Sequence, residues 1–227
     1  MCTKIEGKLS IEIVCGGSLD GWGLRPQVWE MLRFRLMPAL MGPLLASFLC
    51  TGAADASIVQ GLDLAELVAH ADRIVLGRVL FSESFERPDG QLGTWYRIEV
   101  QREIRGRAPD ETEVIVETLG GRIGDLAMRV EGEPSFVVGE RVLVFIRDGG
   151  PYTAFRPVGM GQGVMRVRME QGVETVTQNR EGLMLMRRNA KGRLEPSPGA
   201  LPEKERLDSL LSRLRDLVDR NAGGTDE

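Results

Sequence analysis

The pattern of hydrophobic and polar residues changes from helical to strand-like close to residue 72. In residues 62–71, apolar side chains recur at the i, i+3, i+4, i+7 spacing of a helix with one buried face. Asp63 precedes this stripe and Glu66 follows three positions later, which is the pattern of a capping box. The segment therefore predicts a short N-terminal amphipathic helix.

After residue 72, apolar and β-branched residues occur in short runs that turn residues separate. The runs occupy residues 73–81, 95–104, 113–118, 126–130, 141–147, 152–158, 163–169, 173–177 and 183–186. Alternation in 95–104 indicates a strand with one wet face, and the apolar run in 141–147 indicates a central strand. Gly77 predicts a bulge in the first run. Short strands at this spacing are typical of a sandwich or barrel, so we expect a mainly β fold.

The C-terminal part predicts a linker followed by a helix. Residues 187–202 are rich in Gly, Pro and Asn and predict the linker, 203–220 predict an amphipathic helix, and 221–227 predict a disordered polar tail. The apolar stripe of this helix consists of Leu207, Leu210, Leu211, Leu214, Leu217 and Val218. Six aliphatic side chains are costly to leave in water, so the helix should dock on the barrel or on a partner.

The apolar run in residues 31–56 has the order of a secretory signal peptide. Arg33 and Arg35 precede the apolar residues of this segment, which ends at the small-x-small pattern of Ala54 and Ala56, directly before Ser57. We expect cleavage after Ala56 and export to the periplasm or the extracellular space, without membrane attachment after cleavage. A retained anchor and a buried helix are the alternatives, because the run is long enough for either.

This interpretation sets the domain organisation. A signal peptide belongs at the N-terminus, so residues 1–30 are expected to be an upstream extension or a mis-assigned start. The mature chain then consists of a β-barrel domain over 57–186, the linker, and the C-terminal helix.

Composition excludes several kinds of chemistry from the mature chain. The three cysteines are Cys2, Cys15 and Cys50, and the single histidine is His70. Cysteine nucleophiles, thiolate metal sites and multi-histidine metal sites are therefore excluded after residue 56. His70 is expected at the end of the first helix, near its negative terminus or facing solvent. The formal net charge of −4 lacks the basic excess that nucleic-acid binding needs. We assign no catalytic, cofactor-binding or metal-binding residue.

Three motifs resemble the netrin-like domain of tissue inhibitors of metalloproteinases. They are ADRIVLGRV in residues 71–79, YRIEV with a following RG in 96–106, and GERVLVF in 139–145. They are also similar to a recurrent kind of uncharacterised exported bacterial protein. The resemblance covers about residues 62–169 and implies an OB-type barrel flanked by helices, with an extracellular protease as one candidate partner. Those inhibitors grip the protease zinc through an N-terminal cysteine, whereas cleavage here would leave Ser57.

Recognition on a rigid scaffold usually lies in loops, and three loops rich in Gly, Pro and acidic residues are the candidates here. The residues expected to contact a partner are Gly120, Gly121, Asp125, Glu131, Glu133, Pro134, Phe136, Gly159, Gly161 and Gly163. The spacing in 159–163 does not match a dinucleotide-binding fingerprint, so a flexible hairpin or barrel corner is expected there.

Taken together, the sequence predicts an exported, non-catalytic binding module for an unknown extracytoplasmic protein. One alternative is a hydrolase that uses carboxylates such as Glu131 and Glu133, although these side chains are expected to be solvated loop charges. The other alternative is a structural envelope protein held by its C-terminal helix.

Overall fold

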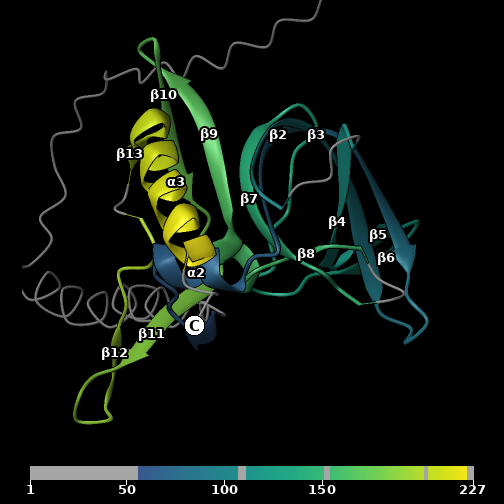
Figure 1. The fold of residues 1–227 in the computed structure, drawn as a ribbon. Coiled ribbons are helices and arrows are strands. Elements are labelled where there is room, and N and C mark those ends of the chain that lie inside the picture. The colour runs from purple at the N-terminus through teal and green to yellow at the C-terminus, as the bar shows by residue number, and fades with distance from the viewer. Residues whose placement is uncertain (1–55, 107–110, 151–153, 202–203, 224–227) are drawn as a thin grey trace, which may run out of the picture. The chain divides into compact units, whose positions relative to one another are not determined.

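The computed structural model describes residues 56–106, 111–150, 154–201 and 204–223 (Figure 1). Residues 1–55, which include most of the predicted signal peptide and Ala54, lie outside the described residues, as do residues 224–227 of the predicted tail. The described part is mainly β, with two α-helices, as expected. In chain order the elements are β1 (Ser57–Gln60), α2 (Leu64–His70), β2 (Arg73–Glu86), β3 (Leu92–Arg105), β4 (Glu113–Leu119), β5 (Gly121–Ile123), β6 (Leu126–Met128), β7 (Arg141–Arg147), β8 (Arg156–Pro157), the 3-10 helix η1 (Met160–Gly163), β9 (Val164–Glu170), β10 (Val173–Gln178), β11 (Leu183–Arg188), β12 (Leu194–Pro196), β13 (Glu205–Arg206) and α3 (Leu207–Gly223).

One large sheet organises the described residues. Its strand order is β13-β10-β9-β7-β2-β3-β4, and β8 pairs with the end of β7. As its apolar run predicts, β7 is central, between β2 and β9. The ladder is an open path that ends at β13 and β4, and a single parallel bridge joins Val116 of β4 to Phe155, the residue before β8. Two small sheets, β1-β11-β12 and β5-β6, complete the strand pairing.

The predicted irregularity at Gly77 is present in β2. The register of β2 against β3 shifts between Leu76 and Gly77. A Cβ atom at Gly77 would overlap the carbonyl oxygen of Glu99 on the neighbouring strand, so glycine permits the close approach of the two backbones.

Hydrophobic side chains form a cluster on each face of this sheet. Ile74 and Leu76 of β2 belong to the cluster that also holds both helices, whereas Val75 and Val79 belong to the cluster between β2, β3, β4 and β7. Alternate residues of one strand thus enter different clusters, because successive side chains of a strand point to opposite faces.

The two helices share the first cluster. In α2 the side chain of Asp63 accepts from the Glu66 amide (2.9 Å), and the Glu66 carboxylate accepts from the Asp63 amide (2.7 Å), so the predicted capping box is confirmed. In α3, which runs alongside β9 and β10 in Figure 1, the leucine stripe is buried against the sheet. Leu207, Leu210, Leu211 and Leu214 are buried there, and Leu217 and Val218 are partly buried, so the expected docking of the helix on the rest of the domain is observed.

Several boundaries differ from the sequence prediction. The predicted linker over 187–202 contains regular structure in its described residues 187–201, because β11 continues to Arg188, β12 pairs with it, and Leu201 is buried. The C-terminal helix begins at Leu207 instead of residue 203, after the short strand β13. β2 and β3 extend as a long hairpin to Glu86 and Leu92. The side chains at the end of β2 are mostly exposed, so the sequence there has no apolar pattern, although the backbone pairing continues.

Candidate functional site

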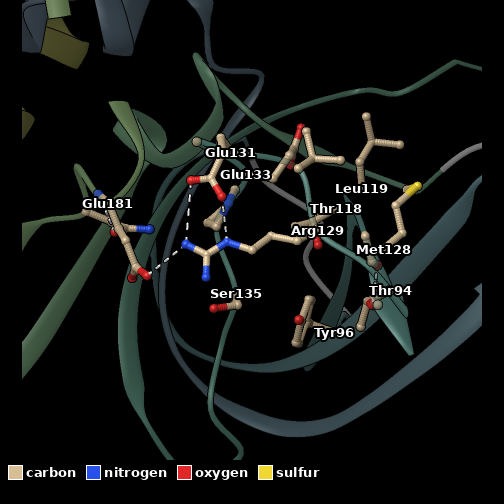
Figure 2. A pocket seen from close by; sticks show the side chains of 16 residues that line it. Thr94, Tyr96, Thr118, Leu119, Met128, Arg129, Glu131, Glu133, Ser135 and Glu181 are labelled. Carbon is tan, nitrogen blue, oxygen red and sulfur yellow. Dashed lines mark hydrogen bonds and ion pairs between the residues drawn. The ribbon is translucent and has the colours of Figure 1, made fainter. Parts of the chain in front are cut away.

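A small pocket lies at the end of the β3–β4 ladder (Figure 2). Its volume is about 220 Å³. The lining residues come from β3, the end of β4, the hairpin β5–β6, the 129–135 loop and the turn before β11: Thr94, Tyr96, Thr118, Leu119, Gly120, Gly121, Met128, Arg129, Val130, Glu131, Gly132, Glu133, Pro134, Ser135, Asn179 and Glu181.

Two adjacent glycines let the chain leave β4 and turn into the hairpin at this point. Gly120 and Gly121 have φ values of +96° and +147°, which side chains other than glycine rarely tolerate. Gly120 also accepts a hydrogen bond from the Thr94 hydroxyl (2.7 Å), and a Cβ at Gly121 would collide with the hydroxyls of Ser84 and Thr94. The pocket wall is therefore built by backbone packed directly on β2 and β3 side chains.

The mouth of the pocket carries a network of ion pairs. In Figure 2 the Arg129 guanidinium points toward two carboxylates. Its Nε lies 2.7 Å from Oε1 of Glu131, and its Nη2 lies 3.6 Å from Oε1 of Glu181. Arg129 and Glu181 are exposed, so these contacts are weak and a competing charged group can replace them.

Glu133 is different, because its side chain is only 10% exposed. Burial raises the pKa of this carboxyl group, and the nearby carboxylate of Glu117 raises it further. Arg156, at 3.8 Å, and the Leu119 backbone amide act in the opposite direction. The expectation that Glu133 is a solvated loop charge is therefore wrong, since the 129–135 loop folds its side chain against the end of the sheet.

The inner part of the pocket is lined by hydroxyl groups. Burial raises the pKa of the Tyr96 hydroxyl, while the Phe136 backbone and the hydroxyls of Thr118 and Thr94 act in the opposite direction. The ring of Tyr96 packs edge-on against Phe136, with the ring centroids 4.7 Å apart. A ligand group that enters the pocket thus meets carboxylates at the mouth and hydroxyls deeper inside.

The structure brings part of the predicted set together. Gly120, Gly121, Glu131, Glu133 and Pro134 line this one pocket, although Gly121 and Glu131 are ten positions apart in sequence. The pairing of β3 with β4 and the return of the chain through β5–β6 place the loops side by side.

The remaining predicted residues lie elsewhere. Asp125 is exposed in the turn of the β5–β6 hairpin and does not line the pocket. Phe136 is buried in the second hydrophobic cluster, as aromatic residues next to strands usually are, and so cannot contact a partner. Ser57 begins β1, and its hydroxyl donates to the carbonyl oxygen of Glu131 (2.8 Å), whereas its neighbour Ala56 is exposed.

The third predicted loop is a buried corner instead of a flexible hairpin. Residues Met160–Gly163 form η1, in which Gly161 and Gly163 are buried, and Gly159 precedes it with a left-handed backbone. The amide of Gly161 donates to the carbonyl oxygen of Gly132 (2.9 Å), so this corner supports the 129–135 loop from behind.

Four residues of the pocket lining could not be recognised as site residues from the sequence. Arg129 and Glu181 are ordinary surface charges in the sequence, and Thr94 and Tyr96 are ordinary strand residues. Only the tertiary arrangement makes them neighbours.

Other kinds of site have less support in the part of the chain that the structure describes. No group of three or more His, Cys, Asp and Glu side chains there is arranged to hold a metal ion. His70 is exposed at the C-terminal end of α2. Neither of the described helices has the length and hydrophobicity needed to cross a bilayer.

Comparison with known proteins adds no family assignment. No protein-family model matches the chain, and no curated protein matches it.

Proposed function

We propose that the chain is an exported, non-catalytic binding module that recognises an extracytoplasmic protein through the pocket of Figure 2. The supporting observation is that two loops rich in Gly, Pro and acidic residues converge on one pocket. Loops held by a rigid sheet are where recognition usually lies.

The chemistry of the pocket favours a cationic group of the partner. Three glutamates and one arginine are the charged residues in its lining. The volume of about 220 Å³ is smaller than that of ordinary small-molecule sites, so it suits a single side chain. A lysine or arginine side chain would compete with Arg129 for Glu131 and Glu181 and would place its donors near the Tyr96 hydroxyl.

A comparative capture experiment tests this proposal. The full chain, immobilised, should retain a protein from an extracytoplasmic fraction, and the double substitution Glu131→Gln and Glu181→Gln should abolish retention. Glu83→Gln and Glu195→Gln, which change charge equally at exposed residues outside the pocket, should not. Retention that survives the pocket substitutions, or is lost equally in both double variants, would contradict the proposal.

We also propose that the sheet closes as an OB-like barrel of the netrin-like type. The meander β2-β3-β4, the pairing of β7 with β2, and the antiparallel pair β7-β8 support this arrangement. The parallel bridge from Val116 to Phe155 would join β4 to β8, and the Glu117 amide donates to the Phe155 carbonyl oxygen (2.8 Å). A partly open, five-stranded barrel is the expected form of an OB fold.

Hydrogen exchange distinguishes a closed barrel from an open sheet. In a closed barrel the Glu117 amide should be protected as strongly as amides in the β2–β7 ladder. Exchange at the rate of an edge strand would mean that β4 is a free edge and that the barrel is not closed.

Export with cleavage after Ala56 belongs to the same proposal. The mature chain would then begin at Ser57, which is the first residue of β1, so cleavage would leave every described strand intact. N-terminal sequencing of the protein from its host should return Ser-Ile-Val-Gln. Recovery of a chain that begins at Met1 or Met31 would refute this step.

The netrin-like resemblance makes an extracellular protease one candidate partner. The mature chain would have no cysteine, so inhibition would have to come from loop contacts and not from zinc chelation. Inhibition of a metalloprotease that persists in the Glu131→Gln and Glu181→Gln variant would place the contact outside this pocket.

One observation favours the alternative of a carboxylate-dependent hydrolase. Glu133 is buried with a raised pKa, while Glu131 in the same pocket is paired with Arg129, so two carboxyl groups in different environments line one pocket. A screen against glycoside, ester and peptide substrates tests it. Turnover that disappears in Glu133→Gln, with no partner retained, would replace the binding module by the enzyme.

A further inference from the structure

A second hollow, distinct from the acidic pocket, lies where β7 begins beside the far end of β9. Its volume is about 350 Å³. Four arginines and two glutamates are the charged residues in its lining. We call this hollow the arginine groove and define it by Arg78, Gly139, Glu140, Arg141, Arg166, Val167, Arg168, Met169 and Glu174.

Two of the four arginines already have carboxylate partners. Arg141 forms an ion pair with Glu174 and donates to the side chain of Gln101 (2.7 Å). Arg166 donates to the carbonyl oxygen of Ser135 (3.0 Å), and its Nε lies 4.0 Å from Oε2 of Glu140. These contacts fix the two guanidinium groups and account for both glutamates.

The other two arginines, Arg78 and Arg168, form no ion pair with the described residues of the groove. Arg78 donates to the carbonyl oxygen of Gly139 (2.9 Å), and Arg168 is exposed, and neither forms an ion pair with another described residue. In addition, the buried Nε of Arg166 has no hydrogen-bond partner among the described residues. The groove lining thus holds four arginines against two glutamates, and Arg78 and Arg168 lie outside the ion pairs that the described residues form.

The positive charge continues into the neighbouring hollow, which shares Arg141 and Glu174 with the groove. That hollow adds Arg102 and Arg215, against one further carboxylate from Asp208. The whole chain carries a net charge of −4, so this concentration of arginines is not the result of a generally basic surface.

We propose that the arginine groove binds a phosphate-type oxyanion. Guanidinium groups present planar, paired N–H donors that match the oxygens of phosphate, and they remain charged at all physiological pH values. Arg78 and Arg168 supply charges outside the ion pairs of the groove, while Arg141 and Arg166 are held in place by their protein contacts. The phosphate group belongs either to a small soluble molecule or to a lipid headgroup.

Titration of the full chain with inorganic phosphate tests the site. The Nε–Hε signal of Arg166 in a ¹H–¹⁵N spectrum should shift and saturate, because Arg166 lines the groove. Loss of a charge-assisted hydrogen bond weakens binding about tenfold or more, so Arg78→Gln together with Arg168→Gln should raise the Kd by at least that factor.

A matched control separates a specific site from general charge. Arg122→Gln together with Arg193→Gln removes the same charge from exposed residues outside both hollows and should leave the Kd unchanged. If both double variants weaken binding equally, or if no signal of the groove moves, the proposal is wrong.

A parallel measurement identifies the source of the phosphate. Phosphatidylcholine vesicles with and without phosphatidylglycerol should be compared for sedimentation of the protein. Sedimentation that requires phosphatidylglycerol and is lost in Arg78→Gln with Arg168→Gln indicates a lipid headgroup. Saturable phosphate binding without sedimentation indicates a soluble ligand, and absence of both results refutes the site.

Discussion

The side chain of Gln162 joins the N-terminal strand to the main sheet, and its replacement tests the packing of the fold. Gln162 lies in η1 and is 1% exposed. Its Oε1 accepts from the Leu62 amide (2.8 Å), and its Nε2 donates to the carbonyl oxygens of Gln60 (3.0 Å) and Gly159 (3.2 Å). One buried amide therefore satisfies backbone groups on both sides of the junction.

The substitution Gln162→Leu keeps the approximate volume and removes all three bonds. The Leu62 amide is partly buried and would lose its partner, at a cost of about 1–3 kcal/mol. Gln60 is exposed, so water can hydrate its carbonyl oxygen, and the loss there should be nearer ~1 kcal/mol. The Gly159 oxygen keeps the bond from the Gln162 amide. We therefore expect a loss of about 2–4 kcal/mol, which lowers Tm by roughly 5–15 °C in a domain of this size.

Thermal and urea unfolding of the full chain measure this change. Gln60→Leu is the matched control, because the side chain of Gln60 is exposed and the same substitution there should cost less than about 0.5 kcal/mol. Gln162→Glu should be more stable at acidic pH than at neutral pH, since only the protonated carboxyl can donate to Gln60. A Gln162→Leu variant as stable as the control would refute this account of the junction.

Three further predictions concern other parts of the fold. Leu214→Asp should cost at least about 3–5 kcal/mol, because Leu214 is fully buried, whereas Ser212→Asp on the exposed face of α3 should be nearly neutral in the same melting experiment. Arg73→Ala should cost about 2–4 kcal/mol by denaturant unfolding, since it leaves the partly buried Glu103 unpaired. Burial raises the pKa of Glu133, so its carboxyl favours folding most at acidic pH and least above its raised pKa. Glu133→Gln should therefore gain stability relative to the unsubstituted chain as the pH of the melting experiment rises toward neutrality, and no gain would refute the assigned burial.

Elements with a strong local signal could be predicted from the sequence. The capping box of Asp63 and Glu66 defines the start of α2, because its two hydrogen bonds depend only on residues three positions apart. The apolar run of β7 was predicted with its observed bounds, Arg141–Arg147, since burial on both faces leaves no polar positions. The leucine stripe predicted α3 for the same kind of reason, although its first turn was placed too early.

Features that depend on tertiary contacts could not be predicted. Glu133 has the sequence context of an exposed loop residue, yet Gly132 turns with φ +87° and the loop packs against the sheet end, which buries the carboxyl. Gln162 lies in a glycine-rich stretch that suggests flexibility. Its side chain is buried and hydrogen-bonded because Gln60 and Leu62, about 100 residues earlier in the sequence, pack against it. Strand β12 has too few residues for a recognisable pattern and forms because β11 offers it an edge.

The 129–140 segment between β6 and β7 takes part in both candidate sites. Its first half supplies the carboxylates of the acidic pocket, and its second half supplies Gly139 and Glu140 to the arginine groove. Arg166 of β9 contacts a residue of each site, because it donates to the carbonyl oxygen of Ser135, which lines the acidic pocket, and lies 4.0 Å from Glu140. The two sites carry charge of opposite sign, so a single partner that fills both must present a cationic and an anionic group at a fixed spacing. Such complementarity contributes more to specificity and association rate than to raw affinity. Because Arg129, Arg168 and Glu181 are exposed, association with that partner should slow as the salt concentration rises.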